Sequence, residues 1–340
     1  MNLRDQLLQA AKRAGEVLVD TGAKRRIREE GYTRIDPVAI AEDDGVPVMV
    51  RPMEKLLGAF LMEEESPGIL VNSQRPIGMV HLTCAHELGH FFLGHGTKTD
   101  EDLDYGSTAT PEERAANEFA YKLLMPKWLV AHMMQRKGWG RRNLQQASVV
   151  YQLSLRLGVS YAAMVWSLNH LALLDTGAAQ TLSRVSPKSL KEATSPRGPE
   201  ALQGGDVWAL DLRDQDFVIE PHASDRFVVE LPNHASAGYV WTAEEASAAG
   251  FTIRPVLIDA SAVAKPSVPV MVGGASNSAY LLEPSAGAVN SDAVLPVKLA
   301  ERQPWTSGEP HNRFALRARY ETLSEGLSRG TRRRLVEGAA

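Results

Sequence analysis

The stretch HLTCAHELGH, residues 81–90, places two histidines four residues apart, with a glutamate directly after the first. Positions four apart lie on one face of an α-helix, roughly 6 Å from each other. His86 and His90 can therefore direct their imidazoles at one metal ion, and zinc suits this spacing. Glu87 stands beside the first ligand, where it can take a proton from a zinc-bound water as a general base.

A catalytic zinc needs a third protein ligand and an open position for water. The downstream side chains that could supply this ligand are His95, Asp100, Asp104, Glu112, Glu113 and Glu118. His95 follows His90 by five residues, on another helical face, which favours a structural or substrate-binding role. Thr110 to Glu113 also spells a capping box, in which the glutamate would bond the threonine amide. The spacing alone leaves Glu113 open between cap and ligand.

The segments around this stretch predict a domain that mixes helices with a small sheet. Apolar residues recur at helical spacing over 1–30, and Asp36 with Pro37 starts a short helix that Gly45 ends. Three short strands are expected to form a small antiparallel sheet, at 46–50, 58–63 and 68–72. Further helices are expected at 76–92, at 110–125 and over much of 127–174.

Composition and charge exclude several classes of protein. The length of 340 residues favours two or more domains. The net charge of −4 gives no global reason to expect nucleic acid or an anionic membrane as a partner. Cys84 is the single cysteine, so no internal disulfide can form. Since we find neither a signal-peptide core nor an apolar run long enough to span a membrane, we expect a cytoplasmic protein.

The sequence pattern changes after the helical part. Residues 176–205 are rich in Ser, Pro, Gly and charge without a sustained period, which is typical of a linker. Beyond them apolar residues alternate with period two, for example in FALRARY at 314–320. This alternation predicts an antiparallel β-sandwich or barrel.

HLTCAHELGHFFLGH followed by ERAANEFAYKLLMP resembles the ImmA/IrrE family of zinc metallopeptidases. That family pairs a His-Glu-Leu-Gly-His helix with a Glu-x-x-Ala-Asn-x-Phe-Ala helix that ends in Leu-Met-Pro. Carried over position by position, the resemblance implies zinc ligands at His86, His90 and Glu113 and a general base at Glu87. Cys84 is a departure, because the family more often has an aliphatic residue there.

The resemblance covers about residues 5–175 and implies a partner as well. Family members typically cleave a helix-turn-helix transcriptional repressor and so release phage, mobile-element or stress-response genes. Residues 153–171 themselves resemble a helix-turn-helix, with Gly158 in the turn. Because 159–171 contains neither Lys nor Arg, a structural or repressor-docking role is favoured over DNA binding.

Three short motifs in the β-rich part resemble the loops of chagasin-like inhibitors of papain-type cysteine proteases, which are immunoglobulin-like sandwiches. The motifs are HASAGYVW (234–241), MVGGASNSAY (271–280) and RQPW (302–305). The resemblance makes Tyr239, Trp241 and Trp305 candidate binding residues, although Tyr239 and Trp241 would equally suit a sandwich core. The sequence departs from the inhibitor pattern at 234–237, where His-Ala-Ser-Ala replaces Asn-Pro-Thr-Thr, and at Gln303, which replaces arginine.

Patterns and resemblances together predict a multidomain α+β chain. The expected parts are a zincin-like metallopeptidase domain at 1–128, a helical, helix-turn-helix-like segment at 129–175, a linker at 176–205, a chagasin-like β-sandwich at 206–322 and a disordered basic tail at 323–340. The expected function is that of a zinc endopeptidase for a specific protein. The alternative is a non-catalytic regulatory protein that acts through its chagasin-like or helix-turn-helix-like region.

Overall fold

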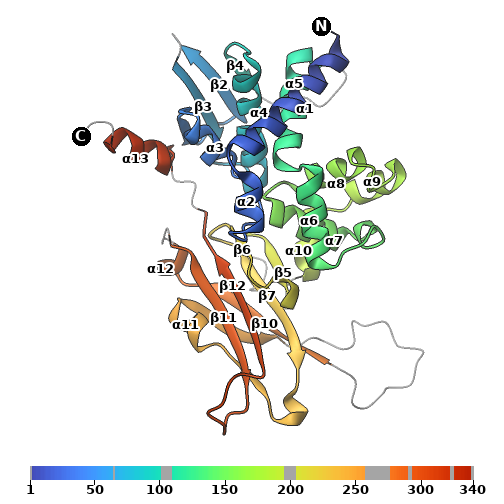
Figure 1. Ribbon diagram of the computed structural model, residues 1–340, viewed down its shortest axis with the longest axis vertical. Helices are drawn as coiled ribbons and strands as arrows, with labels where there is room; N and C mark the ends of the chain where they lie inside the picture. The colour runs from blue at the N-terminus through green and yellow to red at the C-terminus, as the bar shows by residue number, and fades with distance from the viewer. Residues whose placement is uncertain are drawn as a thin grey trace. The chain divides into compact units, whose positions relative to one another are not determined.

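The structure is a computed structural model that describes residues 2–63, 66–100, 109–194, 204–256, 276–289, 293–321 and 325–337. The chain divides into two compact units (Figure 1). The first unit consists of Met1–Gln135, Gly140–Ser183 and Leu323–Ala340, and the second of Arg136–Trp139 and Arg184–Thr322. The chain thus leaves the first unit, builds most of the second and then returns.

Helices form most of the first unit. They are α1 (Leu3–Asp20), α2 (Ala23–Arg28), α3 (Pro37–Asp43), α4 (Ile77–Leu93), α5 (Pro111–Leu124), α6 (Lys127–Lys137, whose last two residues belong to the second unit), η1 (Asn143–Gln145), α7 (Ala147–Leu157), α8 (Tyr161–His170), α9 (Thr176–Ser183) and α13 (Arg329–Glu337). The predicted start of α3 is confirmed, since the Asp36 carboxylate accepts hydrogen bonds from the amides of Val38 and Ala39. α5 packs against both α1 and α4. These two helices, which are separate in the sequence, therefore meet at α5.

A five-stranded sheet with the order β13-β1-β3-β2-β4 completes the first unit. Its strands are β1 (Val48–Arg51), β2 (Gly58–Glu63), β3 (Ser66–Asn72), β4 (Lys98–Asp100) and β13 (Gly326–Leu327). The prediction of an antiparallel sheet is wrong for β1, which pairs in parallel with β3. The strand order explains the difference. β3 lies between β1 and β2, so β1 does not pair with β2, the strand that follows it in sequence, and only β2 is antiparallel to β3. α4 packs against β2 and β3.

The C-terminal tail is ordered over residues 325–337, where disorder was expected. β13 pairs antiparallel with the edge strand β1. The Glu42 carboxylate, near the end of α3, accepts hydrogen bonds from the hydroxyl of Ser328 and the amide of Thr331. The polarity of the tail suggested disorder, but a sheet edge and a carboxylate elsewhere in the chain supply partners for its backbone.

The segment expected to be a linker, 176–205, is helical over much of its described length. It contains α9 and α10 (Pro187–Thr194), and the chain passes from the first unit to the second between Ser183 and Arg184. Ser186 accepts a hydrogen bond from the amide of Ser189 at the start of α10, and Leu190 is buried. Polar residues that suggested a linker therefore include helix caps.

Two four-stranded sheets build the second unit, with the orders β5-β7-β10-β9 and β6-β12-β11-β8. The strands are β5 (Val207–Leu210), β6 (Val218–Ile219), β7 (Arg226–Asn233), β8 (Val240–Thr242), β9 (Phe251–Val256), β10 (Ser276–Pro284), β11 (Leu295–Arg302) and β12 (Asn312–Ala318). Short helical segments lie between them, at η3 (Leu212–Asp214), η4 (Ala235–Ala237), α11 (Glu244–Ala248) and α12 (Ala286–Val289).

The predicted alternation in β12 is confirmed, because Phe314, Leu316 and Ala318 are all buried. Two strand pairs, β5 with β7 and β6 with β12, are parallel, so these sheets are mixed. A helical N-terminal region and a β-rich C-terminal region are thus present as expected. The immunoglobulin-like topology stays a prediction.

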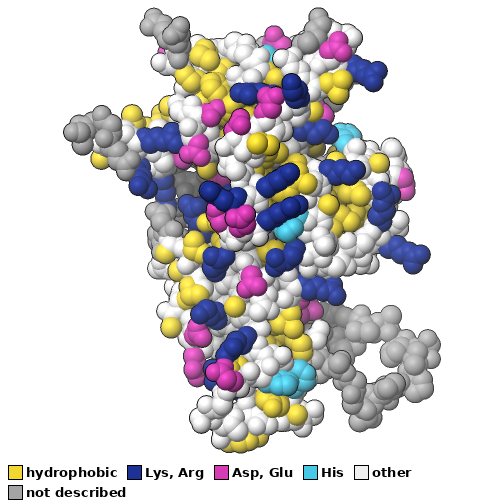
Figure 2. Space-filling model, in the orientation of Figure 1, with side chains coloured by type: hydrophobic (Ala, Val, Ile, Leu, Met, Phe, Trp, Pro, Cys, Tyr) yellow, Lys and Arg dark blue, Asp and Glu magenta, His cyan; other side chains and the backbone are white. Residues whose placement is uncertain are grey.

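The surface carries charge of both signs. On the face shown in Figure 2, basic and acidic side chains are interspersed on each unit. Among the residues that the structure describes, no helix combines the length and the apolar character needed to cross a lipid bilayer.

Candidate metal centre

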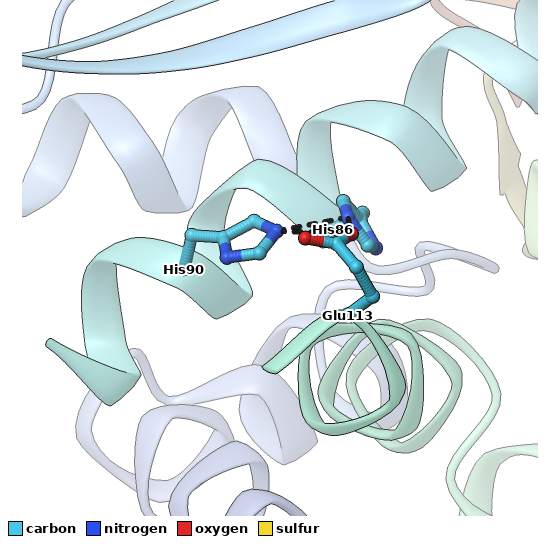
Figure 3. Close-up of side chains that lie close together, drawn as sticks. All are labelled: His86, His90 and Glu113. Atoms are coloured by element: carbon cyan, nitrogen blue, oxygen red, sulfur yellow. Dashed lines mark hydrogen bonds and ion pairs between the residues drawn. The ribbon is translucent and has the colours of Figure 1, made fainter. Parts of the chain in front are cut away.

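His86, His90 and Glu113 meet where α4 packs against α5 (Figure 3). The Nε2 atom of His86 lies 3.0 Å from Nε2 of His90 and 3.2 Å from Oε2 of Glu113. The distance from Nε2 of His90 to the same glutamate oxygen is 3.6 Å. α4 supplies both histidines from one face, and the first turn of α5 supplies the carboxylate, so the contact between the two helices creates the cluster.

The spacing of these three atoms fits a tetrahedral ion. Ligand atoms held about 2.0–2.1 Å from such an ion stand about 3.4 Å apart. The three distances between the ligand atoms, 3.0, 3.2 and 3.6 Å, lie around that value. Two imidazoles and one carboxylate are also a donor set used by catalytic zinc, and they leave one position for water or substrate. The residues present therefore fit a zinc ion.

The cluster is buried on its α4 side. His86 is 1% exposed, and Glu87 and His90 are fully buried. Glu113 is 18% exposed, so the carboxylate is the part of the cluster that solvent reaches. Burial of this kind is costly for polar groups unless they are compensated, and the mutual approach of the three side chains provides such compensation.

The spacing left the Glu113 carboxylate open between the Thr110 amide and the metal cluster, and the structure directs it at the cluster. The hydroxyl of Thr110 accepts a hydrogen bond from the Glu113 amide at 3.2 Å and so caps α5. The Glu113 carboxylate, in contrast, points at the two imidazoles. Hydrogen bonds with His86 and His90 hold the pKa of Glu113 well below its usual range, against the opposing effect of burial.

The other ring nitrogen of each histidine is also held in place. Nδ1 of His86 lies 3.0 Å from Oδ1 of Asn117, and Nδ1 of His90 lies 2.8 Å from Nδ1 of His95. Because Oδ1 of Asn117 can only accept, Nδ1 of His86 carries a proton in this contact, and a neutral His86 held in this way would offer the Nε2 lone pair to a metal. Asn117 and His95 thus serve as positioning residues in this arrangement.

The sequence did not predict which atoms these two residues contact. His95 was left open between a structural and a substrate-binding role, and the structure places its ring against His90. Asn117 lies one turn after Glu113 on α5. A polar side chain within the apolar stripe of α5, on the face that carries Glu113, is the signal that could have identified Asn117.

Glu87 lies against the first residue of β2. A Cβ atom placed on Gly58 would be 2.4 Å from Cγ2 of Thr83 and 2.9 Å from Oε1 of Glu87. Real Cβ atoms do not approach other atoms so closely, so glycine is required where β2 passes α4. This contact keeps the Glu87 carboxylate within the buried layer between strand and helix.

The predicted helix-turn-helix-like pair is formed by α7 and α8, with Gly158 in a left-handed conformation (φ 67°) between them. The carbonyl oxygen of Gly158 lies 2.7 Å from Nδ1 of His81 on α4. A Cβ on Gly78 of α4 would be only 2.5 Å from the carbonyl carbon of Val159. The turn is therefore used for packing against the helix that carries His86 and His90, which favours a structural role.

The remaining candidates, Tyr239, Trp241 and Trp305, belong to the second unit. Trp305 is 71% exposed. Trp241 is half-buried, and its indole N–H donates to the carbonyl of Pro232 at 2.8 Å. The Tyr239 ring lies 4.5 Å from that of His311, between ring centres.

Residues 41–169 match the family model of the IrrE N-terminal-like domain, peptidase family M78. This part of the chain is similar to IrrE N-terminal-like domains. The match confirms the resemblance inferred from the sequence and implies a protease domain of the metallopeptidase type. All three residues of the cluster, and Glu87, lie within the matched range. A comparison with curated protein sequences gives no match.

Two solved structures are similar to part of the chain. The cysteine protease inhibitor EhICP2 from Entamoeba histolytica has 17% identity and a TM-score of 0.25, and the match covers 34% of this chain and 95% of the inhibitor. The solution structure of Amebosin has 15% identity and a TM-score of 0.24, with 35% and 100% of the two chains covered. Similarities of this size carry no conclusion about the fold or the function of the second unit.

Proposed function

We propose that the IrrE N-terminal-like domain is a zinc-dependent endopeptidase. The observation that carries the proposal is the meeting of His86, His90 and Glu113 at distances that suit one tetrahedral ion, with Glu87 next to the first of them on α4. The family match supports the same chemistry. His86, His90 and Glu113 would hold the ion.

The residues around the cluster then have distinct tasks. A bound zinc ion would supply a Lewis acid that polarises the scissile carbonyl and makes a water more acidic. Glu87 accepts the proton of the attacking water and passes it to the leaving amine as the peptide bond breaks. Asn117 and His95 keep the two imidazoles turned with Nε2 toward the centre. Burial of Glu87 strengthens its electrostatic interactions there.

The proposed substrate is a helix-turn-helix transcriptional repressor in the cytoplasm, whose cleavage would release stress-response, phage or mobile-element genes. The resemblance of both helices to the ImmA/IrrE pattern supports this choice. In the second unit, Tyr239, Trp241 and the exposed Trp305 are proposed to take part in choosing the partner protein, because aromatic side chains suit such contacts.

Co-expression with a helix-turn-helix repressor encoded beside this gene would test the proposal. The natural protein is expected to produce one defined repressor fragment. Glu87→Gln is expected to keep zinc and slow cleavage by at least about 100-fold, because the amide cannot accept the proton. Glu118→Gln is the matched control, since Glu118 lies on α5 but pairs with Lys122. Equal cleavage by Glu87→Gln with zinc bound would refute the mechanism.

The exposed Trp305 favours one other candidate function, a non-catalytic regulator that binds a partner through the second unit. In that case Glu87→Gln would leave the effect on the regulated genes intact, whereas Trp305→Ala would abolish it. Measuring both variants for gene expression and for repressor cleavage separates the two functions.

A further inference from the structure

A second group of metal-binding side chains lies in the second unit, outside the IrrE N-terminal-like domain. It consists of His234, Glu301 and His311, with one potential ligand atom of each within 4.8 Å of the others. His234 directly follows β7, Glu301 lies near the end of β11, and His311 directly precedes β12. We propose that these three residues bind a second divalent transition-metal ion of the zinc type.

Glu301 is the first reason for this proposal. β11 alternates between inward and outward positions, and its inward positions hold Val297, Leu299 and then Glu301. The glutamate is thus fully buried at a position where the pattern of the strand calls for an apolar residue. A buried carboxylate is costly unless positive charge and hydrogen bonds compensate it. The site therefore favours positive charge beside Glu301, which a charged His234 or a bound cation would supply.

The neighbours of Glu301 supply donors around both carboxylate oxygens. Nδ1 of His234 lies 2.9 Å from Oε1 and 3.0 Å from Oε2. The side-chain amide of Asn312 donates to Oε2 at 2.5 Å. Asn312 thereby orients the carboxylate, as hydrogen-bond partners of metal ligands commonly do. A metal ion would take the place of the proton between His234 and Glu301.

His311 is held close to this pair by the register of β11 and β12. Its backbone amide donates to the carbonyl of Glu301 at 2.8 Å. Its ring stands at 87° to that of His234, with 5.2 Å between ring centres. One nitrogen of His311 lies within 4.8 Å of the other two ligand atoms. Its side chain is exposed, so a change of rotamer can bring this nitrogen to the roughly 3.4 Å of a tetrahedral site. Figure 2 shows histidine atoms exposed on the second unit.

The donor set selects the class of ion. Two imidazoles and a carboxylate suit zinc and neighbouring transition metals, whereas magnesium and calcium prefer oxygen ligands. His234 and His311 are accessible to solvent, so an ion can enter without opening the sheets. This site uses the same donor types as the cluster of the first unit but lies on separate elements.

An ion at this place would join two connections of the second unit. It would link the β7–β8 connection to both ends of the β11–β12 connection, which carries Trp305. Trp305 lies over Gly238, where a Cβ would come within 2.5 Å of the indole Cη2 atom. Tyr239 lies against His311. Metal binding would thus fix the exposed aromatic surface formed by Trp305 and Tyr239.

Counting zinc in the full-length protein tests the proposal. After equilibration with a small excess of zinc and desalting, we expect two zinc ions per chain in the natural protein. The double variant His86→Gln with His90→Gln should hold one, His234→Gln with His311→Gln should hold one, and the fourfold variant none. His222→Gln removes a histidine of the same unit outside the cluster and should still hold two.

The outcomes separate this proposal from the proposed function. If only the cluster of the first unit fails to bind zinc, the natural protein holds one ion, which His234→Gln with His311→Gln removes. A natural protein whose zinc is unchanged by those two substitutions overturns the second site. Because His311 is exposed, His311→Gln alone is expected to keep the circular dichroism of the natural protein and still lose one zinc.

A spectroscopic readout follows from Trp305. In the variant with His86→Gln and His90→Gln, added zinc should shift tryptophan emission, since the ion orders the connection that carries Trp305. His311→Gln or Trp305→Phe in that background should remove the shift. A shift that persists in both variants would contradict an ion bound by His311 beside Trp305.

Discussion

Nδ1 of His86 lies 3.0 Å from Oδ1 of Asn117, which follows Glu113 by one turn of α5. α5 therefore supplies one candidate ligand and also the group that sets the tautomer of another. Two neighbouring turns of α5 thus supply both a candidate ligand and a positioning group of the metal centre.

Asn117→Ala is expected to weaken zinc binding about 10- to 100-fold, since His86 loses the acceptor that keeps its proton on Nδ1. Competition with a chromogenic chelator measures this loss. Glu118→Gln, on the same helix, is the control and should bind zinc as the natural protein does. Unchanged affinity in Asn117→Ala would show that His86 does not depend on this hydrogen bond.

Gly58→Ala is expected to lower the free energy of unfolding by about 1–3 kcal/mol, because the new methyl group would collide with Thr83 and Glu87. Urea denaturation measures the change. Gly68→Ala, in β3, meets no atom within 4 Å and is the matched control. Adding Thr83→Ser to Gly58→Ala removes Cγ2 and should restore part of the stability. Cleavage should be impaired in both variants, because the methyl group added at Gly58 would still displace the Glu87 carboxylate.

Asp36 is expected to make stability depend on pH in acid. Burial opposes ionisation, but Arg34, Arg26 and His81 outweigh it and lower the Asp36 pKa to about 2. A carboxyl pKa that is lower in the folded state contributes stability above the unfolded value of 3.8, and this contribution is lost as pH falls through about 2. Asp36→Asn keeps a cap acceptor without the charge, so it should cost about 2 kcal/mol at pH 7 and almost nothing at pH 2.

Asp36→Ala is the companion variant, since it removes the cap of α3 together with the charge. Its deficit should persist at pH 2 at about 1 kcal/mol, the usual contribution of an N-cap. Urea denaturation at both pH values, followed by helical circular dichroism, measures the two variants. Equal deficits of Asp36→Asn at pH 7 and pH 2 would contradict the electrostatic explanation.

Removal of residues 326–340 is expected to destabilise the first unit, since β1 loses β13, one of its two partner strands, and Glu42 loses the bonds from Ser328 and Thr331. An unprotected strand edge also promotes association. The midpoint of thermal unfolding and light scattering measure both effects. Arg334→Ala, which removes only a surface ion pair with Asp43, should change stability by less than about 1 kcal/mol.

The centre of the candidate site could be predicted because its geometry is local. His86, Glu87 and His90 lie in one helix, whose period fixes their relation. Glu113 is harder to assign from sequence, because its amide serves the cap while its carboxylate faces the histidines. A glutamate at this spacing can also bond the Thr110 amide, so spacing alone could not decide between the two interpretations.

Features that depend on distant pairing could not be predicted in the same way. The contact of His95 with His90 requires the path of the chain beyond α4, and the pairing of β13 with β1 joins segments far apart in sequence. The parallel arrangement of β1 and β3 likewise depends on the strand order, which the lengths of the strands do not reveal. The roles of Tyr239, Trp241 and Trp305 stay predictions.

The return of the chain to β1 makes the second unit an insertion within the first. A single protease cut at one crossing between the units leaves them covalently joined through the other crossings. A tag or fluorophore fused after Ala340 is attached to the unit that carries His86 and His90, and not to the β-rich unit that precedes it in sequence. Fusion experiments that aim to follow the β-rich unit therefore need an internal attachment point.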